Sequence, residues 1–271
     1  MAPTLRIVDR PGPGPLVVMV HGSMDRAASF FKAADHLRDL HVILYDRRGY
    51  GRSVGVRPPP RGVDDHVEDL MAIVDSRPAV VAGHSYGGLV GLAAGVRHPD
   101  LIRAVAAFEA PMPWMEWWPK NTAGGAVQSV VSATDAGDAA EAFMRRMLGN
   151  ERWESLPDRT REARRREGPT LVAELTTIRQ PPPPFSTDDL TFPVVIGHGG
   201  RSLPHHQDAA RFLAGHIPQA ELVVIDGAQH GAHASHPAAF AGFVRRAVAL
   251  SGLPATSTAA TAPTAPAAPA D

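Results

Sequence analysis

Short apolar runs alternate with longer amphipathic segments along most of the 271-residue chain. The runs are rich in Val and Ile, and near-continuous runs of this kind are typical of parallel strands covered on both faces. The segments between them repeat their apolar positions at helical spacing. We predict strands at residues 16–20, 42–45, 80–82, 104–108, 194–196 and 222–225, and helices at residues 29–40, 64–76, 87–98, 204–216 and 237–250.

This order of elements predicts an α/β fold built on a doubly wound, mostly parallel sheet. Residues 4–9 are expected to add an antiparallel strand at one edge. We assign residues 1–110 and 190–250 to this core. The last segment, residues 251–271, is rich in Ala, Pro and Thr, and we expect it to be disordered because it has too little apolar surface to bury.

The alternation breaks between residues 111 and 189, which we predict to be a helical cap inserted into the core. Helical patterns lie at residues 139–148 and 159–166, and the proline run at 181–184 excludes both helix and inner strand. Three tryptophans, Trp114, Trp117 and Trp118, stand close together near the start of this segment. They either pack the interior of the cap or line a pocket for the substrate.

Composition narrows the class of protein and of partner. Apolar residues make up 44% of the chain, enough for a sizeable core, and the net charge of -1 indicates neither nucleic acid nor a membrane surface as a partner. Cysteine is absent, which excludes disulfides, thiol catalysis and thiolate metal ligands. The first residues lack the pattern of a secretory signal and no window is long and apolar enough to span a bilayer, so we expect a cytoplasmic protein.

The most informative motif is GHSYG at residues 83–87. It follows the predicted strand 80–82 and opens the predicted helix 87–98, the strand–turn–helix context that the G-x-S-x-G motif of a nucleophilic serine requires. Ser85 is the candidate nucleophile. The N–H of Tyr86 would lie at the start of the helix, where it can stabilise an oxyanion.

Together with three further motifs, GHSYGG at residues 83–88 resembles the α/β-hydrolase superfamily. The other motifs are HGS at 21–23, DRRGYGRS at 46–53, and GAQH at 227–230 followed by His236, Pro237 and Phe240, and all occur in the order and at the separations of that family. The resemblance implies that His230 is the general base and that no cofactor is needed. It places the second oxyanion donor at the N–H of Ser23, with Met24 as the alternative, so Met24 is expected beside the substrate.

Other polar residues of these motifs are assigned structural roles. The Asp and Arg residues of 46–53 are expected to pin a turn. His233 and His236 follow His230, but no carboxylate accompanies them at metal-ligand spacing, so we predict no metal site. His205 and His206 are expected on the surface.

The family pattern fails at the acid that should orient His230, because Ser202 occupies the position where most relatives carry an Asp. Glu109 is our candidate in its place. It ends the apolar strand 104–108, and active sites of open α/β sheets lie at the carboxyl ends of the strands. One subset of the haloalkane dehalogenases is similar in placing its acid there. The alternative is a Glu109 that pairs with an arginine or faces solvent.

Asp226 is the runner-up as the acid, while Asp208 and Asp188 are weaker candidates. A serine nucleophile favours acyl transfer over the alkyl-enzyme chemistry of carboxylate nucleophiles. We therefore predict a hydrolase that forms an acyl-enzyme from the ester or lactone of a small to medium, partly apolar molecule. Amide or carbon–carbon cleavage, a cofactor-free lyase or cyclase, and a non-catalytic small-molecule receptor remain alternatives on the same fold. The sequence carries no signal for an oligomeric state.

Overall fold

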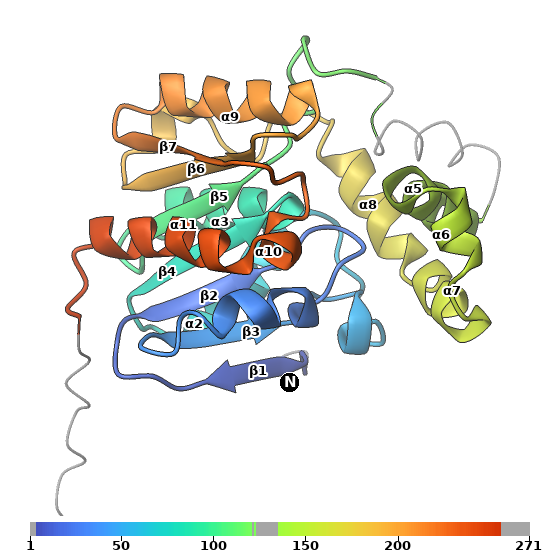
Figure 1. The fold of residues 1–271 in the computed structure, drawn as a ribbon, viewed down its shortest axis with the longest axis horizontal. Coiled ribbons are helices and arrows are strands. Elements are labelled where there is room, and N and C mark those ends of the chain that lie inside the picture. The colour runs from blue at the N-terminus through green and yellow to red at the C-terminus, as the bar shows by residue number, and fades with distance from the viewer. Residues whose placement is uncertain (1–3, 121, 123–134, 256–271) are drawn as a thin grey trace, which may run out of the picture.

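The computed structural model describes residues 4–120, 122 and 135–255 (Figure 1). Within these ranges a seven-stranded sheet has the order β1-β3-β2-β4-β5-β6-β7. The strands are β1 (Ile7–Arg10), β2 (Leu16–Val20), β3 (His41–Tyr45), β4 (Ala79–His84), β5 (Ile102–Phe108), β6 (Val194–Gly199) and β7 (Ala220–Ile225). All neighbours pair in parallel except β1, which is antiparallel to β3. The predicted α/β fold with its mostly parallel sheet is confirmed, although the edge strand begins at Ile7 and not at residue 4.

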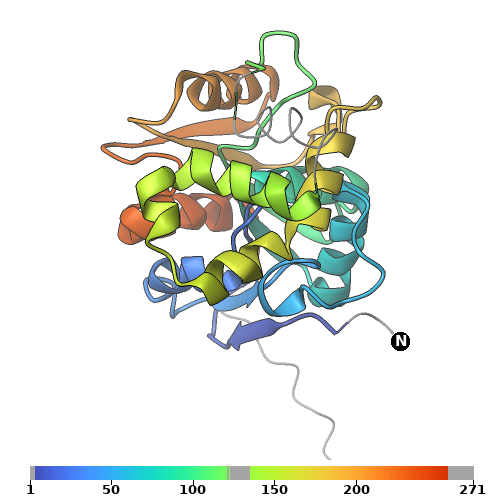
Figure 2. The same cartoon turned by 90° about the vertical axis from the view of Figure 1, so that its right-hand side faces the viewer.

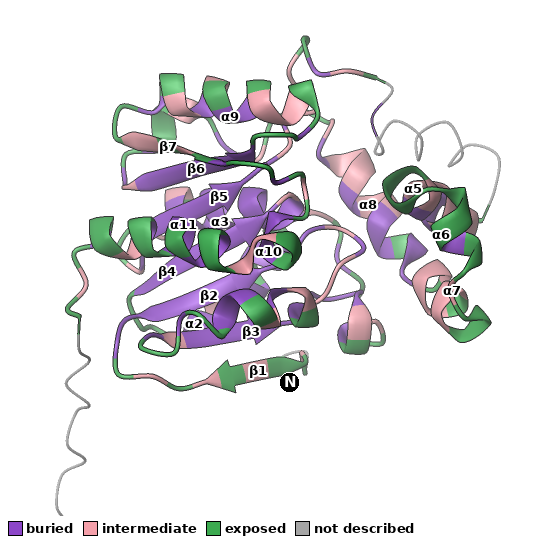
Figure 3. Cartoon of the chain, viewed as in Figure 1, coloured by how far each residue is buried: buried purple, intermediate pink, exposed green. Residues whose placement is uncertain are grey.

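Helices cover both faces of the sheet (Figures 1 and 2). One face carries α2 (Val63–Val74), α3 (Tyr86–Arg97) and α9 (Pro204–His216), and the other carries α1 (Phe31–Ala34), α10 (Ala232–Ser235) and α11 (Pro237–Leu250). Successive side chains of a strand point to opposite faces, so Val17 of β2 packs in one apolar cluster and Val18 in the other. The central strands are therefore buried along their whole length (Figure 3).

The helix predicted at residues 29–40 is wrong beyond Ala34. A 3-10 turn (Ala27–Phe30) and the short helix α1 occupy its first half, and the chain then continues in turns. The N–H groups of Leu37 and Leu40 donate to carbonyls three residues earlier, not four. Residues three apart still share one side in such turns, so the apolar spacing of a helix persists where the helix itself has ended.

In the described part of the connection between β5 and β6, four α-helices lie beyond the carboxyl ends of the parallel strands (Figures 1 and 2). They are α5 (Ala136–Leu148), α6 (Asn150–Glu154), α7 (Asp158–Arg165) and α8 (Gly168–Thr177). The patterns at 139–148 and 159–166 predict α5 and α7, whereas α6 and α8 were not predicted. Residues 121 and 123–134 of the expected cap, and the expected tail from residue 256 onward, lie outside the described residues. No helix within the described ranges is both long and apolar enough to cross a membrane.

A buried carboxylate, Glu174 of α8, fastens these helices to the core. Its Oε1 accepts hydrogen bonds from Nη1 of Arg47 at 2.5 Å and from Nε2 of His66 at 2.8 Å. Its Oε2 accepts from the hydroxyls of Ser23 at 2.6 Å and Tyr50 at 2.7 Å. Burial by itself would raise the pKa of Glu174, but Arg47 and His66 outweigh it and hold the pKa far below its usual range. Glu174 is therefore a buried anion with full compensation, and α8 is fixed over the loop that carries Ser23.

The turn between β4 and α3 forces Ser85 into a left-handed backbone conformation, with φ 54° and ψ -124°. Glycine is required on both sides of it. A Cβ on Gly83 would lie 2.2 Å from the carbonyl oxygen of Gly87, and one on Gly87 would lie 2.0 Å from that of Val20. The N–H of Ser85 donates to the carbonyl of Phe108 at 2.8 Å, which ties the turn to β5. The strained serine is thus held by contacts that only small residues allow.

We expect Gly87→Ala to lower the free energy of unfolding by about 1–3 kcal/mol, because the added methyl group meets backbone that cannot move independently. Chemical denaturation monitored by circular dichroism measures the change. Gly242→Ala is the matched control. That glycine is exposed in the middle of α11 and an added Cβ would have no neighbour within 4 Å, so the substitution should stabilise the helix by about 0.5–1 kcal/mol. Equal effects of the two substitutions would contradict the close approach at Gly87.

Candidate active site

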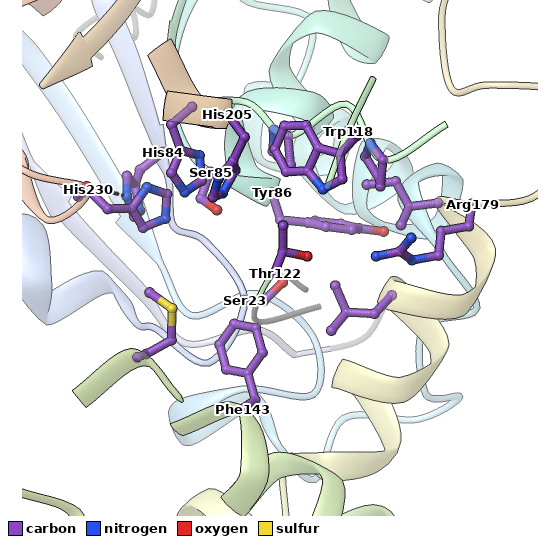
Figure 4. A pocket seen from close by; sticks show the side chains of 16 residues that line it. Ser23, His84, Ser85, Tyr86, Trp118, Thr122, Phe143, Arg179, His205 and His230 are labelled. Carbon is purple, nitrogen blue, oxygen red and sulfur yellow. Dashed lines mark hydrogen bonds between the residues drawn. The ribbon is translucent and has the colours of Figure 1, made fainter. Parts of the chain in front are cut away.

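Ser85 and His230 line the same pocket at the carboxyl edge of the sheet (Figure 4). Ser85 follows β4, His230 lies between β7 and α10, and Glu109 directly follows β5. The Nδ1–H of His230 donates to Oε2 of Glu109 at 2.6 Å, and the carboxylate is buried behind the imidazole. The structure therefore brings all three predicted residues together although they are far apart in the sequence.

Both carboxylate oxygens of Glu109 accept hydrogen bonds. Its Oε1 accepts from the N–H of Gly199 at 2.8 Å and from the hydroxyl of Ser202. Burial alone would raise the pKa of Glu109, but the hydrogen bonds from His230, Gly199 and Ser202 outweigh it, and the pKa is lowered. Ser202, at the position where the family pattern predicts an Asp, thus donates a hydrogen bond to the carboxylate of Glu109.

The three alternative acids lie elsewhere. Asp226, Asp208 and Asp188 are all exposed, and no hydrogen bond or ion pair joins any of them to His230 within the described ranges. A carboxylate in solvent stabilises an imidazolium far less than one that is buried beside it. Among the four candidates, the geometry favours Glu109.

The two residues predicted to supply the oxyanion donors both line the pocket. Tyr86 is the first residue of α3, so its N–H has no acceptor within the helix, and both Tyr86 and Ser23 line the pocket. The Ser23 hydroxyl donates to Glu174, which fixes the loop after β2. Met24, the alternative donor, has a positive φ of 58°, as Ser85 does. Its side chain packs in the apolar cluster with Tyr50 and does not line this pocket.

Only one of the three predicted tryptophans reaches the pocket. Trp118 lines it and meets the ring of His205 edge-on, with 4.9 Å between ring centroids. Trp114 packs against Phe185 instead, and Trp117 is 40% exposed and packs against Phe212. The rest of the wall is largely apolar and combines Pro111, Pro113, Phe143, Met147, Leu175 and Ile178, with the polar residues His84, Thr122, Arg179, His205 and His206.

His205 and His206 were expected on the surface, but both are only partly exposed. Both line the pocket, and the ring of His206 stacks on that of His230 with centroids 4.4 Å apart and an interplanar angle of 18°. Burial, reinforced by His230 and His205, lowers the pKa of His206 well below its usual value. The signal in the sequence was their position shortly after strand β6, at the carboxyl edge where the site lies.

Asp46 and Arg47 have the structural roles expected of them. The carboxylate of Asp46 accepts from the N–H groups of Ala27 at 2.9 Å and Arg52 at 2.8 Å, which pins the turn. Arg47 donates to the carbonyl of His21 at 2.8 Å and to Glu174. Neither side chain lines the pocket.

Two groups of side chains within the described ranges place three metal-binding donor atoms within 4.8 Å of one another. They are Glu109 with His206 and His230, and Asp25 with His84 and His233. One carboxylate and two imidazoles suit divalent transition metals. Sequence spacing missed both groups because each carboxylate comes from a distant segment. A metal on the first group would compete for Glu109 and His230, which now hydrogen-bond to each other.

The chain is also similar in sequence and structure to known proteins. The model of the family described as "Alpha/beta hydrolase family" matches residues 17–243. A pimeloyl-[acyl-carrier protein] methyl ester esterase of Chromobacterium violaceum is 28% identical over 239 residues, which cover 84% of this chain and 92% of that protein.

Two further similarities are more limited. An uncharacterized hydrolase of Bacillus subtilis is 35% identical, but the alignment covers 36% of this chain and 38% of that protein. The structure of a thermophilic esterase from Thermogutta terrifontis superposes with a TM-score of 0.70 at 22% identity, over 92% of this chain and 94% of the other. At that identity the superposition supports the fold alone.

Three buried histidines, His21, His66 and His84, and the largely buried His206 should make the protein less stable in acid. Burial is the largest cause that lowers the pKa of each below the usual value of 6.5, to about 3 for His21. Between the folded value and 6.5 the unfolded chain binds more protons than the folded one, so the free energy of unfolding falls as pH falls through this window. Each such group contributes a slope of at most about 1.4 kcal/mol per pH unit.

Urea denaturation between pH 7 and pH 5 measures this slope. His206→Phe keeps an aromatic ring on His230 and should reduce the slope by up to about 1.4 kcal/mol per pH unit. The matched control is His36→Phe at an exposed position, which removes a histidine without removing a buried one. The interpretation is wrong if stability is constant over this range or rises on acidification.

Proposed function

The chain belongs to the α/β hydrolase family, and from this premise we propose that it is a serine hydrolase that cleaves an ester or lactone through an acyl-enzyme. The observation that carries the proposal is the hydrogen bond of 2.6 Å between His230 and the buried carboxylate of Glu109, beside the strained Ser85. The bond leaves Nε2 of His230 as the nitrogen available to the serine. This is the arrangement of a nucleophile, a base and a group that orients the base.

The proposed steps follow from these positions. Nε2 of His230 takes the hydroxyl proton of Ser85 while Oγ attacks the carbonyl carbon, and Glu109 stabilises the imidazolium that forms. The N–H groups of Tyr86 and Ser23 donate to the oxyanion. The imidazolium then gives its proton to the leaving oxygen, which departs as an alcohol. Water, deprotonated by His230, attacks the acyl-enzyme and releases the acid and Ser85.

We assign residues 111–189 the role of a cap over this site. Helices α5 and α8 supply Phe143, Leu175 and Ile178 to the pocket, which supports an apolar moiety in the substrate. Glu174 attaches the cap to the loop of Ser23, so the cap and one oxyanion donor are positioned together. A small to medium, partly apolar substrate fits such an enclosure.

Ester chemistry has two supports beyond the fold. Serine as nucleophile forms an ester intermediate that water can hydrolyse, whereas alkyl-enzyme chemistry needs a carboxylate in its place. The Chromobacterium violaceum relative, aligned over most of both chains, is named for methyl ester cleavage. Residence in the cytoplasm and a small molecule as the partner stay predictions of the sequence.

A fluorophosphonate probe and p-nitrophenyl butyrate test the proposal together. We expect the wild type to be labelled at Ser85 and to hydrolyse the ester, and Ser85→Ala to lose labelling and about 10⁶-fold in kcat without losing its fold. Ser235→Ala, at an exposed serine, is the matched control and should behave as the wild type. Labelling without turnover would reject ester hydrolysis, and turnover by Ser85→Ala would reject the nucleophile.

We expect Glu109→Gln to lower kcat by about 10⁴-fold, because an amide cannot stabilise the imidazolium and favours the wrong tautomer of His230. Steady-state kinetics on the same ester measure the loss. Asp226→Asn removes an exposed carboxylate from the same edge of the sheet and should leave kcat unchanged. The reverse outcome, with activity lost only in Asp226→Asn, would move the acid to Asp226.

A further inference from the structure

Arg179 lines the same pocket as Ser85 and His230. It lies just beyond α8, and Figure 4 shows its guanidinium pointing into the cavity at the end opposite Ser85 and His230. Figure 4 shows the rings of Tyr86 and Trp118 between these two ends, and Ile178 and Leu175 also line the pocket. A molecule that reaches from Ser85 to Arg179 therefore passes along an apolar wall and ends at a cation.

No carboxylate of the described residues pairs with this arginine. None of the ion pairs or side-chain hydrogen bonds identified among the described residues includes its guanidinium. Its Nε is buried and has no hydrogen-bond partner among these residues. Residues 121–134, the internal segment that contains the undescribed positions, include neither Asp nor Glu. Burial lowers the pKa of Arg179, and no neighbouring anion opposes that effect.

Two buried arginines, Arg47 and Arg48, show how the fold compensates an arginine with a structural role. Arg47 is fully buried and pairs with Glu174 at 2.5 Å, and Arg48 pairs with Asp69 through two hydrogen bonds. A partly desolvated cation without an anion costs free energy that a paired one recovers. Arg179 is thus the one permanent charge on the described pocket wall, and it is left for a partner that enters the pocket.

We propose that Arg179 binds a carboxylate of the substrate, so that the substrate is an ester or lactone with one anionic group, separated from the scissile carbonyl by an apolar segment. This inference rests on the proposed function, since Ser85 defines where the carbonyl lies. A single guanidinium matches the charge of one carboxylate and the planar geometry of its two oxygens. A phosphate monoester would bring nearly two charges to a wall that offers one.

The test compares two ester series that differ only in charge. The mono-p-nitrophenyl esters of succinic, glutaric, adipic and pimelic acid carry a terminal carboxylate, and their ω-carboxamide analogues are neutral isosteres. We expect kcat/KM of the wild type to be about 10-fold to 100-fold higher for the carboxylate at the best chain length, the range for a hydrogen bond to a charged group. Arg179→Gln should abolish this preference and keep the rate on the carboxamide, and Arg179→Lys should retain part of it.

Arg159→Gln is the matched control, since it removes an exposed arginine from the same group of helices and should keep the preference. Equal kcat/KM for the two series in the wild type, or a preference that survives in Arg179→Gln, would overturn the proposal. A phosphate-bearing ester preferred over every carboxylate would overturn it as well.

A binding experiment separates failure of this inference from failure of the proposed function. Calorimetric titration of Ser85→Ala with the monomethyl ester of the best diacid, or of adipic acid when no ester is turned over, needs no catalysis. Binding about 10-fold to 100-fold tighter than that of the carboxamide analogue, lost in Ser85→Ala with Arg179→Gln, supports the carboxylate site even if hydrolysis is absent. Equal affinity for both ligands contradicts the site even if hydrolysis is present.

Discussion

Burial of the sheet on both faces confines its polar chemistry to the carboxyl edge of the strands. The backbone adopts positive φ values after three neighbouring strands of the sheet. Met24 after β2, Ser85 after β4 and Glu109 after β5 have φ values of 58°, 54° and 50°, and these strands are neighbours in the sheet. Non-glycine residues adopt this conformation at a cost and keep it only where surrounding contacts enforce it. Three of the five non-glycine residues with positive φ in the described ranges therefore lie at this edge, together with the polar residues assigned to the site, whereas Asp75 and Ser76 follow α2.

Two buried carboxylates, Glu109 and Glu174, have different roles at this edge of the sheet. Glu109 accepts three hydrogen bonds and leaves His230 with one nitrogen turned to the pocket, so its charge acts on a group that can change protonation. Glu174 is surrounded by Arg47, His66 and two hydroxyls, so its charge is compensated within the protein and holds α8 in place. The first carboxylate tunes a base, whereas the second positions a wall of the pocket. Either one without its partners would be an uncompensated charge in a medium of low dielectric.

How much the sequence can predict depends on whether a feature is local. The strands and the turn at Ser85 follow from runs and glycine spacing, and Glu109 follows from one carboxylate at the end of an apolar strand. The helix at residues 29–40 failed because turns of three residues keep helical spacing without a helix. The stack of His206 on His230, the partners of Glu174 and the absence of Trp114, Trp117 and Met24 from the pocket depend on contacts between segments that are distant in the sequence. Periodicity carries no information about such contacts.

Arg47 and Arg179 differ in their partners, and this difference bears on the specificity for the substrate. Both belong to the region where α8 meets the core, both are removed from solvent to some degree, and only one has an anion beside it. Selection for stability alone would pair or expose the second arginine, since either change removes a desolvation cost. A site that recognises a charged ligand requires the opposite, because a guanidinium already satisfied by the protein has no hydrogen bonds left to offer. The unpaired arginine is therefore informative because the buried arginines near this pocket, Arg47 and Arg48, each pair with a carboxylate.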